Sequence, residues 1–430
     1  MDLLRQHSIP TPKIYHYDTR ADGAVGTEYI LMQDMPGQAL GNRWFGLDAK
    51  QRIKVLAKIV DLEAKLYSID FPAFGSIFYA KDLPTSFNRE PISRSSSSLQ
   101  LCIGPDVSLK FWSGTREGLS IPRGAALSAE DVLNDGAAKE LAWLKAHGRT
   151  RVPFDRVYRD ITNYQKSDPR QHMASLEAYM QIAAQLVPKE KWLHRPVLRH
   201  PDLHANNILV NDALDITGIV DWQHSTILLL FLSAGIPKHF QNYGDTMSEE
   251  LTEPLVPSLE GLDEEEKLSE LELYRKRHVH YFYVGVTAKK LPDHFHALTQ
   301  EGGMFLRLLY QHASEPWEGN SIPLATHLAL VPLHWNTLGG SQTCPLPLDE
   351  DTTDILVSQL ERQEEADHQM SLLRNSLGIS DDGWVLEGEY DHAQEEAAHY
   401  KVKAVSMADD DHERDMTIRH WPFEDHDEDE

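Results

Sequence analysis

The chain has 430 residues, a formal net charge of −26 at pH 7 and 41% hydrophobic residues. This length and composition predict a folded protein whose core is large enough for two lobes. The acidity excludes the basic surface typical of nucleic-acid binders, and no apolar run approaches the length of a membrane span.

Residues 1–36 predict the end of a short helix, stopped at Pro10, followed by two strands. The strands fall at residues 13–17 and 28–33, because aromatic and β-branched side chains flank a glycine-containing turn at residues 22–26. Together they predict a hairpin.

Helical spacing of apolar residues then predicts helices at residues 51–69, 128–147, 173–187, 264–290, 303–313 and 354–374. Ser128 and Asp263 are placed to cap two of these helices. The polar stretch 81–125 predicts a long loop or insertion, and the acidic residues 391–430 predict a disordered tail.

The most informative stretch is residues 198–224. A turn-rich loop carries His200, Asp202 and Asn207 and is followed by an apolar run at 208–210. A second apolar run, at 216–220, ends directly before Asp221. Loop, strand, turn and strand therefore predict that two carboxylates and an amide gather at one end of a hairpin. Such hard oxygen ligands suit Mg²⁺, which keeps its other positions for water and phosphate.

His200, Asp202, Asn207 and Asp221 together resemble the catalytic and metal loops of the aminoglycoside phosphotransferase and choline kinase-like family. Trp222 after Asp221 matches this branch, whereas protein kinases have phenylalanine and glycine there. Details at residues 100–125 and 220–245 resemble a fungal group similar to the altered inheritance of mitochondria proteins.

The resemblance implies an α+β, protein-kinase-like fold, with a large helical C-lobe and a truncated small β N-lobe. It implies that Asp202 is catalytic, that Asn207 and Asp221 bind Mg²⁺, and that His200 and His204 are structural. ATP would bind at the linker and hairpin, through the residues Gln33, Asp34, Met35 and Leu209.

Under this interpretation residues 1–36 are the remnant of the N-lobe and hinge, and 37–350 are the C-lobe with an insertion at 81–125. Residues 351–390 form a helical extension ahead of the acidic tail. The glycine-rich hairpin and the lysine strand that grip phosphates in the family have no counterpart in this chain, which predicts impaired transfer.

Three functions remain open at this point. The first is transfer of the ATP γ-phosphate to a small-molecule hydroxyl, with a cationic acceptor suited to the acidic chain. The second is a pseudokinase or scaffold that transfers nothing. The third, an outsider, is a metal-dependent hydrolase using His200, Asp202 and His204. Neither a nucleic-acid partner nor a membrane span is expected, and the location is intracellular, mitochondrial by family resemblance and cytoplasmic otherwise.

Overall fold

The computed structural model describes residues 1–92, 100–340, 343–379, 385 and 388–424. Two compact units divide the chain, one of Met1–Val132 with Pro188–Arg307 and the other of Leu133–Val187 with Leu308–Glu430. This division differs from the expected boundaries at residues 36 and 350. Helices dominate and the sheets have two or three strands each, which confirms the predicted α+β fold. No helix among these residues is long and apolar enough to cross a membrane.

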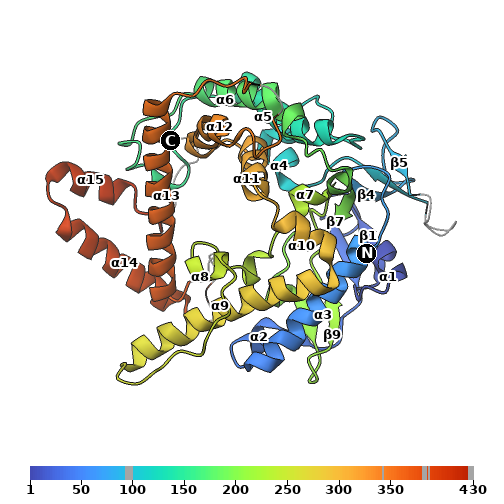
Figure 1. Cartoon of the computed structure of the whole chain (residues 1–430), viewed down its shortest axis with the longest axis horizontal. Coiled ribbons are helices and arrows are strands. Elements are labelled where there is room, and N and C mark those ends of the chain that lie inside the picture. Colours follow the sequence, from blue (N-terminus) through green and yellow to red (C-terminus); the bar gives the residue numbers. More distant parts are fainter. Residues whose placement is uncertain (93–99, 341–342, 380–384, 386–387, 425–430) are drawn as a thin grey trace. The chain divides into compact units, whose positions relative to one another are not determined.

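The first unit contains the short sheets and the region of the motif (Figure 1). Its strands are β1 (Ile14–Asp18), β2 (Tyr29–Met32), β3 (Gln38–Ala39), β4 (Ser76–Tyr79), β5 (Glu90–Pro91), β6 (Leu101–Gly104), β7 (Pro196–Leu198), β8 (Ile208–Val210), β9 (Ile216–Ile219) and β10 (Ile227–Leu229). Its helices are α1 (Asp2–Gln6), α2 (Gly41–Trp44), α3 (Ala49–Tyr67), α4 (Leu109–Trp112), α7 (Leu230–Ser233), α8 (Thr246–Glu249), α9 (Glu264–Lys290) and α10 (Pro292–Leu298).

Strand pairing in this unit follows the predicted hairpins. β1 and β2 pair antiparallel, and so do β8 and β9, with Leu209 opposite Gly218. β3 adds to the free side of β8, so the linker after β2 lies on the hairpin that carries the motif. Gly37 makes this approach possible: a Cβ there would lie 2.7 Å from the Val210 carbonyl oxygen, and its φ is +111°.

Helices α3 and α9 lie side by side and supply much of the core of the first unit (Figure 1). Buried α3 residues include Val55, Leu56 and Ile59, and α9 contributes Tyr283. Capping boxes start both helices, at Asp48 and at Asp263 as predicted. α3 is therefore a fixed support for whatever contacts its buried face.

The second unit is helical. It contains α5 (Ala129–His147) and α11 (Gly303–Ser314), whose first residues belong to the first unit, together with α6 (Pro169–Ile182), α12 (Ile322–His334), α13 (Glu350–Ser376), α14 (Tyr390–Met407) and α15 (Asp411–Arg419). A fully buried Lys139–Glu140 pair braces it, since Lys139 Nζ also donates to the Ser314 carbonyl and Glu140 accepts from Trp317 N–H.

Two sequence predictions were wrong in part. The stretch 81–125 is not wholly irregular, because β6 is a buried strand that pairs with β4 and β5. Its four-residue apolar run is too short to show a period, so only pairing identifies it. Up to residue 424, the acidic tail forms α14 and α15 instead of remaining disordered, and the buried Trp421 anchors it. Residues 93–99 and 425–430 lie outside the described residues.

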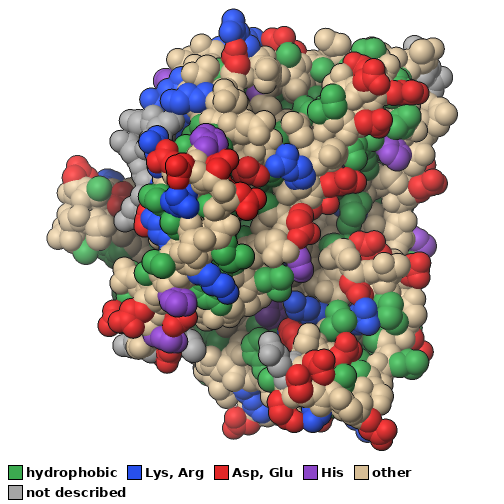
Figure 2. All heavy atoms as spheres, turned by 90° about the vertical axis from the view of Figure 1, so that its left-hand side faces the viewer, with side chains coloured by type: hydrophobic (Ala, Val, Ile, Leu, Met, Phe, Trp, Pro, Cys, Tyr) green, Lys and Arg blue, Asp and Glu red, His purple; other side chains and the backbone are tan. Residues whose placement is uncertain are grey.

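Helix-forming alanines in α14 and a carboxylate cap on α15 explain why the tail is ordered despite its charge. Asp410 accepts from the Glu413 amide at the start of α15, and Arg156 donates to the Trp421 carbonyl at 2.7 Å. On the face shown in Figure 2, carboxylates are interspersed with lysine and arginine side chains, so much of the acidity there is solvated surface charge.

Candidate active site

The loop between β7 and β8 holds the catalytic-loop residues of the motif. His200 is the anchor of this loop: its Nε2 lies 2.8 Å from the Val220 carbonyl, and its Nδ1 accepts the Asp202 N–H at 3.1 Å. Its ring also meets Trp222 edge-on, with the ring centroids 4.6 Å apart. Burial lowers the pKa of His200, and the carbonyl of Val220 and the nearby carboxylates only partly oppose that shift. A neutral His200 therefore fixes the backbone of Asp202.

Both ring nitrogens of His200 are thus engaged by the backbone, which leaves neither of them for a metal. No group of three or more histidine, cysteine, aspartate or glutamate residues is arranged for a metal ion in the described part of the chain. The hydrolase alternative built on His200, Asp202 and His204 does not fit this geometry.

His204 has a different place. Its Nδ1 accepts the Asn206 amide and caps the 3₁₀ turn η5 (Ala205–Asn207), while its Nε2 lies 3.2 Å from Asp202 Oδ2. This contact orients the carboxylate, which is 62% exposed. Asp202 is therefore held at its backbone by one histidine and at its side chain by another.

Asn207 and Asp221 meet through the strand pair. The Val220 amide donates to the Asn207 carbonyl at 3.0 Å, so Asp221 follows directly after the residue bonded to Asn207. Asn207 is buried, and its Nδ2 donates to the Asp202 carbonyl, which leaves Oδ1 as the free acceptor. Asp221 is exposed and has a φ of +62°, a conformation that costs about 1 kcal/mol and is often found at functional sites.

This donor set fits a magnesium ion. A carboxylate and an amide oxygen are hard ligands, and Asp221 has no hydrogen-bond or ion-pair partner among the described residues. Both groups come from neighbouring positions at one end of the β8–β9 hairpin. Mg²⁺ needs only one or two such oxygens when a nucleotide supplies phosphates.

The expected nucleotide residues lie on the linker and on β8. A Cβ added to Gly218 would lie 3.2 Å from Met35 and 3.3 Å from Leu209, so these two side chains flank that glycine. Gln33 instead bonds back to the hairpin. Its backbone N–H donates to the Lys13 carbonyl at 2.8 Å, and its side-chain oxygen accepts the Lys13 N–H. Asp34 is exposed beside it. Met35 and Leu209 therefore come together, while the side chain of Gln33 does not join them.

An ion pair that the motif does not predict holds the whole loop. All of the guanidinium nitrogens of Arg199 donate: to Glu63, to the hydroxyl of Tyr283, and to the carbonyls of Ser233 and Gly235. The Arg199–Glu63 distance is 2.6 Å, and Tyr283 donates to the second oxygen of Glu63. Burial acts to lower the pKa of Arg199, but Glu63 and the two phenols raise it overall. The sequence does not single out Glu63, because its helix carries many charged residues and nothing local shows which of them points into the core.

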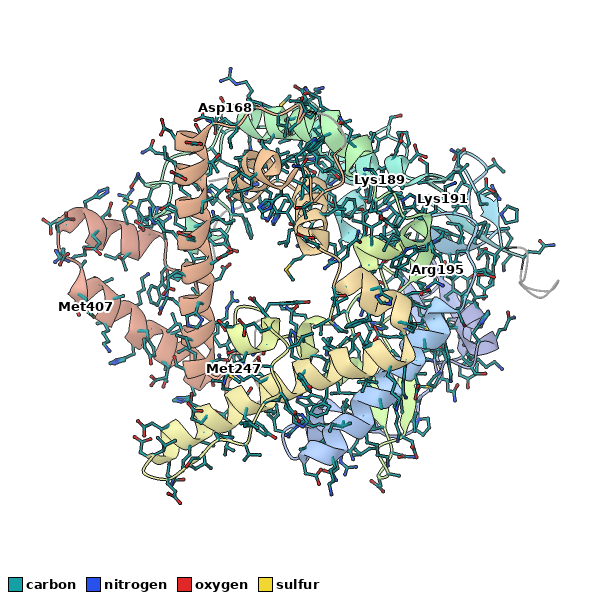
Figure 3. All side chains as sticks on the ribbon, in the orientation of Figure 1. Asp168, Lys189, Lys191, Arg195, Met247 and Met407 are labelled. Atoms are coloured by element: carbon teal, nitrogen blue, oxygen red, sulfur yellow. The ribbon has the colours of Figure 1, made fainter. Side chains whose placement is uncertain are left out.

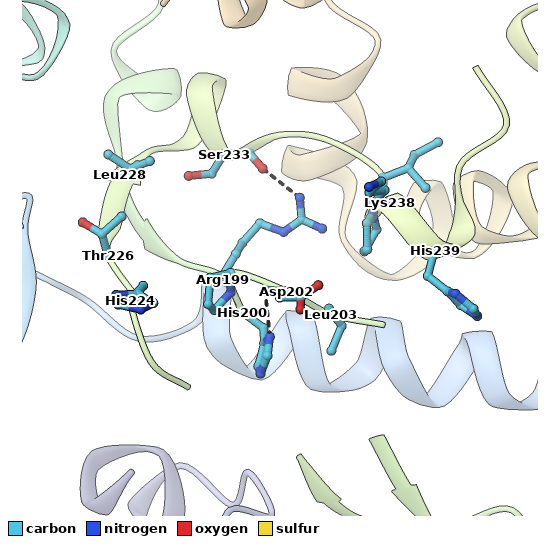
Figure 4. A pocket seen from close by; sticks show the side chains of 13 residues that line it. Arg199, His200, Asp202, Leu203, His224, Thr226, Leu228, Ser233, Lys238 and His239 are labelled. Carbon is cyan, nitrogen blue, oxygen red and sulfur yellow. Dashed lines mark hydrogen bonds between the residues drawn. The ribbon is translucent and has the colours of Figure 1, made fainter. Parts of the chain in front are cut away.

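A cavity of about 320 Å³ opens beside Asp202 (Figure 4). One side is the catalytic loop, here called the loop wall (residues 199–203). Thr226, Lys238 and His239 also line the cavity and are here together called the open wall; the motif identifies none of them. Lys238 and His239 lie on the 3₁₀ turn η6 (Lys238–Phe240). The cavity therefore puts the carboxylate of Asp202 next to space for a small molecule.

The sequence of this chain matches one family model and several named proteins. Residues 1–229 match the phosphotransferase enzyme family (APH). A subtelomeric hrmA-associated cluster protein of Aspergillus fumigatus is 26% identical, over 99% of this chain and 88% of that protein. The mitochondrial protein altered inheritance of mitochondria 9 of Lachancea thermotolerans is 25% identical over 47% of this chain and 36% of its own length.

Solved structures give looser matches. A thermostable mutant of an aminoglycoside phosphotransferase has a TM-score of 0.32 at 14% identity, covering 76% of this chain and 78% of that chain. An ethanolamine kinase of Plasmodium vivax has a TM-score of 0.30 at 14% identity, covering 85% and 70%. The family match itself spans the linker, the catalytic loop and the β8–β9 hairpin, and ends at the last residue of β10. Because these matched residues make up more than half of the chain, the protein belongs to the phosphotransferase enzyme family.

Proposed function

We propose that the chain transfers the γ-phosphoryl group of ATP to a hydroxyl group of a small molecule. The observation that carries the proposal is the position of Asp202. Its backbone is fixed by His200, its carboxylate faces a cavity, and the paired Asn207 and Asp221 lie on the adjoining hairpin. Family membership supports phosphoryl transfer as the chemistry.

In this proposal Asp202 receives the proton of the acceptor hydroxyl. The hydroxyl oxygen forms a bond to the γ-phosphorus, the bond from that phosphorus to the ADP oxygen breaks, and ADP leaves. Asn207 and Asp221 would hold Mg²⁺, which neutralises phosphate charge when it is bound. The backbone at Gln33, Asp34 and Met35, with Leu209 below it, would receive the adenine ring. His200 and His204 keep Asp202 in place.

A second candidate is nucleotide binding without transfer. It is favoured by the one lysine ahead of the linker, Lys13, whose Nζ lies over the ring of Tyr15 at 5.6 Å. A lysine turned toward its own strand is poorly placed to bind phosphate.

The location is a separate part of the proposal. Relatives carry the name altered inheritance of mitochondria 9, mitochondrial, which supports a mitochondrial location for this chain. Fractionation of cells that produce the natural protein tests it. Recovery outside the mitochondrial fraction would contradict it.

The function is tested with radiolabelled γ-phosphate of ATP, Mg²⁺ and a panel of small hydroxyl compounds. Label appearing in an acceptor supports transfer, and its dependence on Asp202 assigns the base. Calorimetry with Mg-ATP is measured in parallel. Nucleotide binding without any labelled acceptor across the panel favours the second candidate, and the absence of both contradicts the two proposals together.

A further inference from the structure

The cavity beside Asp202 has polar groups that the chain itself leaves without a partner. Thr226 Oγ1 and His239 Nε2 are buried atoms that find no hydrogen-bond partner within the described residues. Both belong to the open wall. Buried polar atoms are normally paired, so these two mark the open wall as the less fully satisfied part of the lining.

The charged side chains around the cavity differ in whether they have partners within the chain. Arg199 is saturated by Glu63, Tyr283 and two carbonyls, so its charge is compensated. Lys238 is different: its ammonium forms neither an ion pair nor a hydrogen bond with any residue that the structure describes, and its side chain is exposed at the cavity. In Figure 4, Lys238 and His239 come from the turn on the far side of the cavity from Thr226, with Asp202 between them.

Two histidines of the lining, His200 and His239, do not add positive charge near neutral pH. Burial, with Arg275 as the next cause, lowers the pKa of His239 to about 4. Burial also lowers the pKa of His200. Among the lysine and arginine side chains that the structure describes around the cavity, Lys238 is then the one whose charge is not compensated, and Asp202 is reserved for the reacting hydroxyl.

The lining also lacks what a cationic acceptor requires. Asp202 is the single carboxylate among the described residues around the cavity, and tryptophan, tyrosine and phenylalanine are absent from that set. Ammonium groups are usually bound by carboxylates or by aromatic faces. A cationic acceptor, which the acidity of the whole chain suggested, would compete for the carboxylate that the reaction needs.

We infer that the acceptor pocket takes a small hydroxyl compound that carries an anionic group, carboxylate or phosphate. Lys238 binds the anion. This inference rests on the proposed function, because it assigns the reacting hydroxyl to Asp202. It makes Lys238 a residue that determines acceptor specificity.

The test uses acceptors that share a carbon skeleton and differ in charge: glycerate, glycerol 3-phosphate, glycerol and 2-amino-1,3-propanediol. Affinity is measured by calorimetry on the full chain, with Mg²⁺ and a non-hydrolysable ATP analogue present. We expect the two anions to bind tighter than glycerol, and the amine weakest. Comparison of glycerate with glycerol 3-phosphate separates the two anion sources.

Variants assign the preference to one side chain. Lys238→Met should weaken binding of the anions by roughly three- to tenfold and leave glycerol unchanged, which is the range for one partly exposed ion pair. Lys238→Glu should reverse the order of glycerate and the amine. The matched control is Lys191→Met, an exposed lysine on the 3₁₀ turn η4 (Lys191–His194) and not part of the lining (Figure 3). Thermal unfolding of each variant shows whether it is folded.

Three binding results and one transfer result would overturn the inference. The first is a wild-type chain without preference for the anions, which includes binding none of the four compounds. The second is an anion preference that survives in both Lys238 variants. The third is a Lys238→Met variant that loses affinity for the nucleotide analogue instead, which would assign Lys238 to the phosphates of ATP. Transfer to neutral or cationic acceptors would refute the inference and keep the proposed function, whereas Lys238-dependent anion binding without transfer would do the opposite.

Discussion

The loop wall and the open wall of the cavity differ in how completely the chain satisfies them. On the loop wall, Arg199 uses all of its donor nitrogens and His200 uses both ring nitrogens in contacts within the chain. On the open wall, Thr226 Oγ1, His239 Nε2 and Lys238 Nζ have no such partners among the described residues. The first wall is preorganised before any ligand arrives, and the second leaves the ammonium of Lys238 available to contact one.

This difference predicts opposite responses to substitution. Changes in the loop wall or its supports should destabilise the fold, because each leaves a buried partner unsatisfied. Changes in the open wall should leave stability nearly unchanged and alter binding.

The largest expected effect is on the ion pair under the loop wall. Glu63→Gln leaves the buried guanidinium of Arg199 without its counter-charge and should lower the free energy of unfolding by about 3–5 kcal/mol. The matched control is Asp61→Asn, also on α3, which breaks the exposed pair with Lys290 and should cost less than about 1 kcal/mol. If urea denaturation showed equal losses of unfolding free energy in the two variants, the Arg199–Glu63 pair would stabilise the fold no more than an exposed ion pair does.

The next effect concerns the metal pair. Asp221→Ala should weaken Mg-ATP binding by roughly 10- to 100-fold, because one charged contact to a bound ion is lost. Asp212→Ala, in the exposed turn at the other end of the same hairpin, is the control and should bind normally. Calorimetry decides between them, and unchanged affinity in Asp221→Ala would remove that residue from the site.

The pH dependence of stability should also differ between the two walls. Burial lowers the pKa of His239 to about 4, against an ordinary value of 6.5, so the unfolded state binds more protons between these values. The free energy of unfolding therefore falls as the pH drops from about 6.5 toward 4, and the His239 contribution is fully present above pH 6.5. His239→Phe should remove part of this loss while changing stability at pH 7 by about 1 kcal/mol or less.

His200→Phe is the comparison on the loop wall. It deprives the Asp202 amide and the Val220 carbonyl of their partners and should cost about 1–3 kcal/mol already at pH 7. Melting temperatures of both variants across pH 4–8 provide the measurement. If the two variants had the same stability at pH 7, the contrast between the walls would not hold.

The smallest effect compares two neighbouring hydroxyls. Thr226→Val removes an unpartnered hydroxyl and should leave the free energy of unfolding unchanged or raise it by up to about 1 kcal/mol. Ser225→Ala removes a hydroxyl that donates to the Trp222 carbonyl at 2.7 Å and should cost about 1 kcal/mol. A larger loss in Thr226→Val than in Ser225→Ala would show that Thr226 has a structural partner.

The two walls also differ in how far the sequence could predict them. The hairpin of β8 and β9, with Asp202, Asn207 and Asp221 around it, was predictable because its spacing is local and each turn has its own residue signature. Glu63 and Arg199 were not, since their pairing joins residues 136 positions apart. The open wall carries no motif at all: Thr226 and Lys238 become part of the same cavity lining only after α7 and the following loop fold back.

The tail shows a second limit of sequence reasoning. Its acidic composition indicated disorder, yet α14 and α15 form, α15 with a side-chain cap from Asp410, and Trp421 is buried within the same unit. Composition reports average solvation, whereas a single aromatic anchor and a helix cap depend on individual residues.

The central claim is that Asp202 receives the acceptor proton in a site where other residues hold the nucleotide. Transfer of labelled γ-phosphate, measured together with Mg-ATP affinity in the wild type and in Asp202→Asn, tests it most directly. We predict that the variant keeps its nucleotide affinity and its unfolding temperature and loses transfer by about 10²- to 10⁴-fold, the usual contribution of a general base. Transfer at the wild-type rate in Asp202→Asn would contradict the claim.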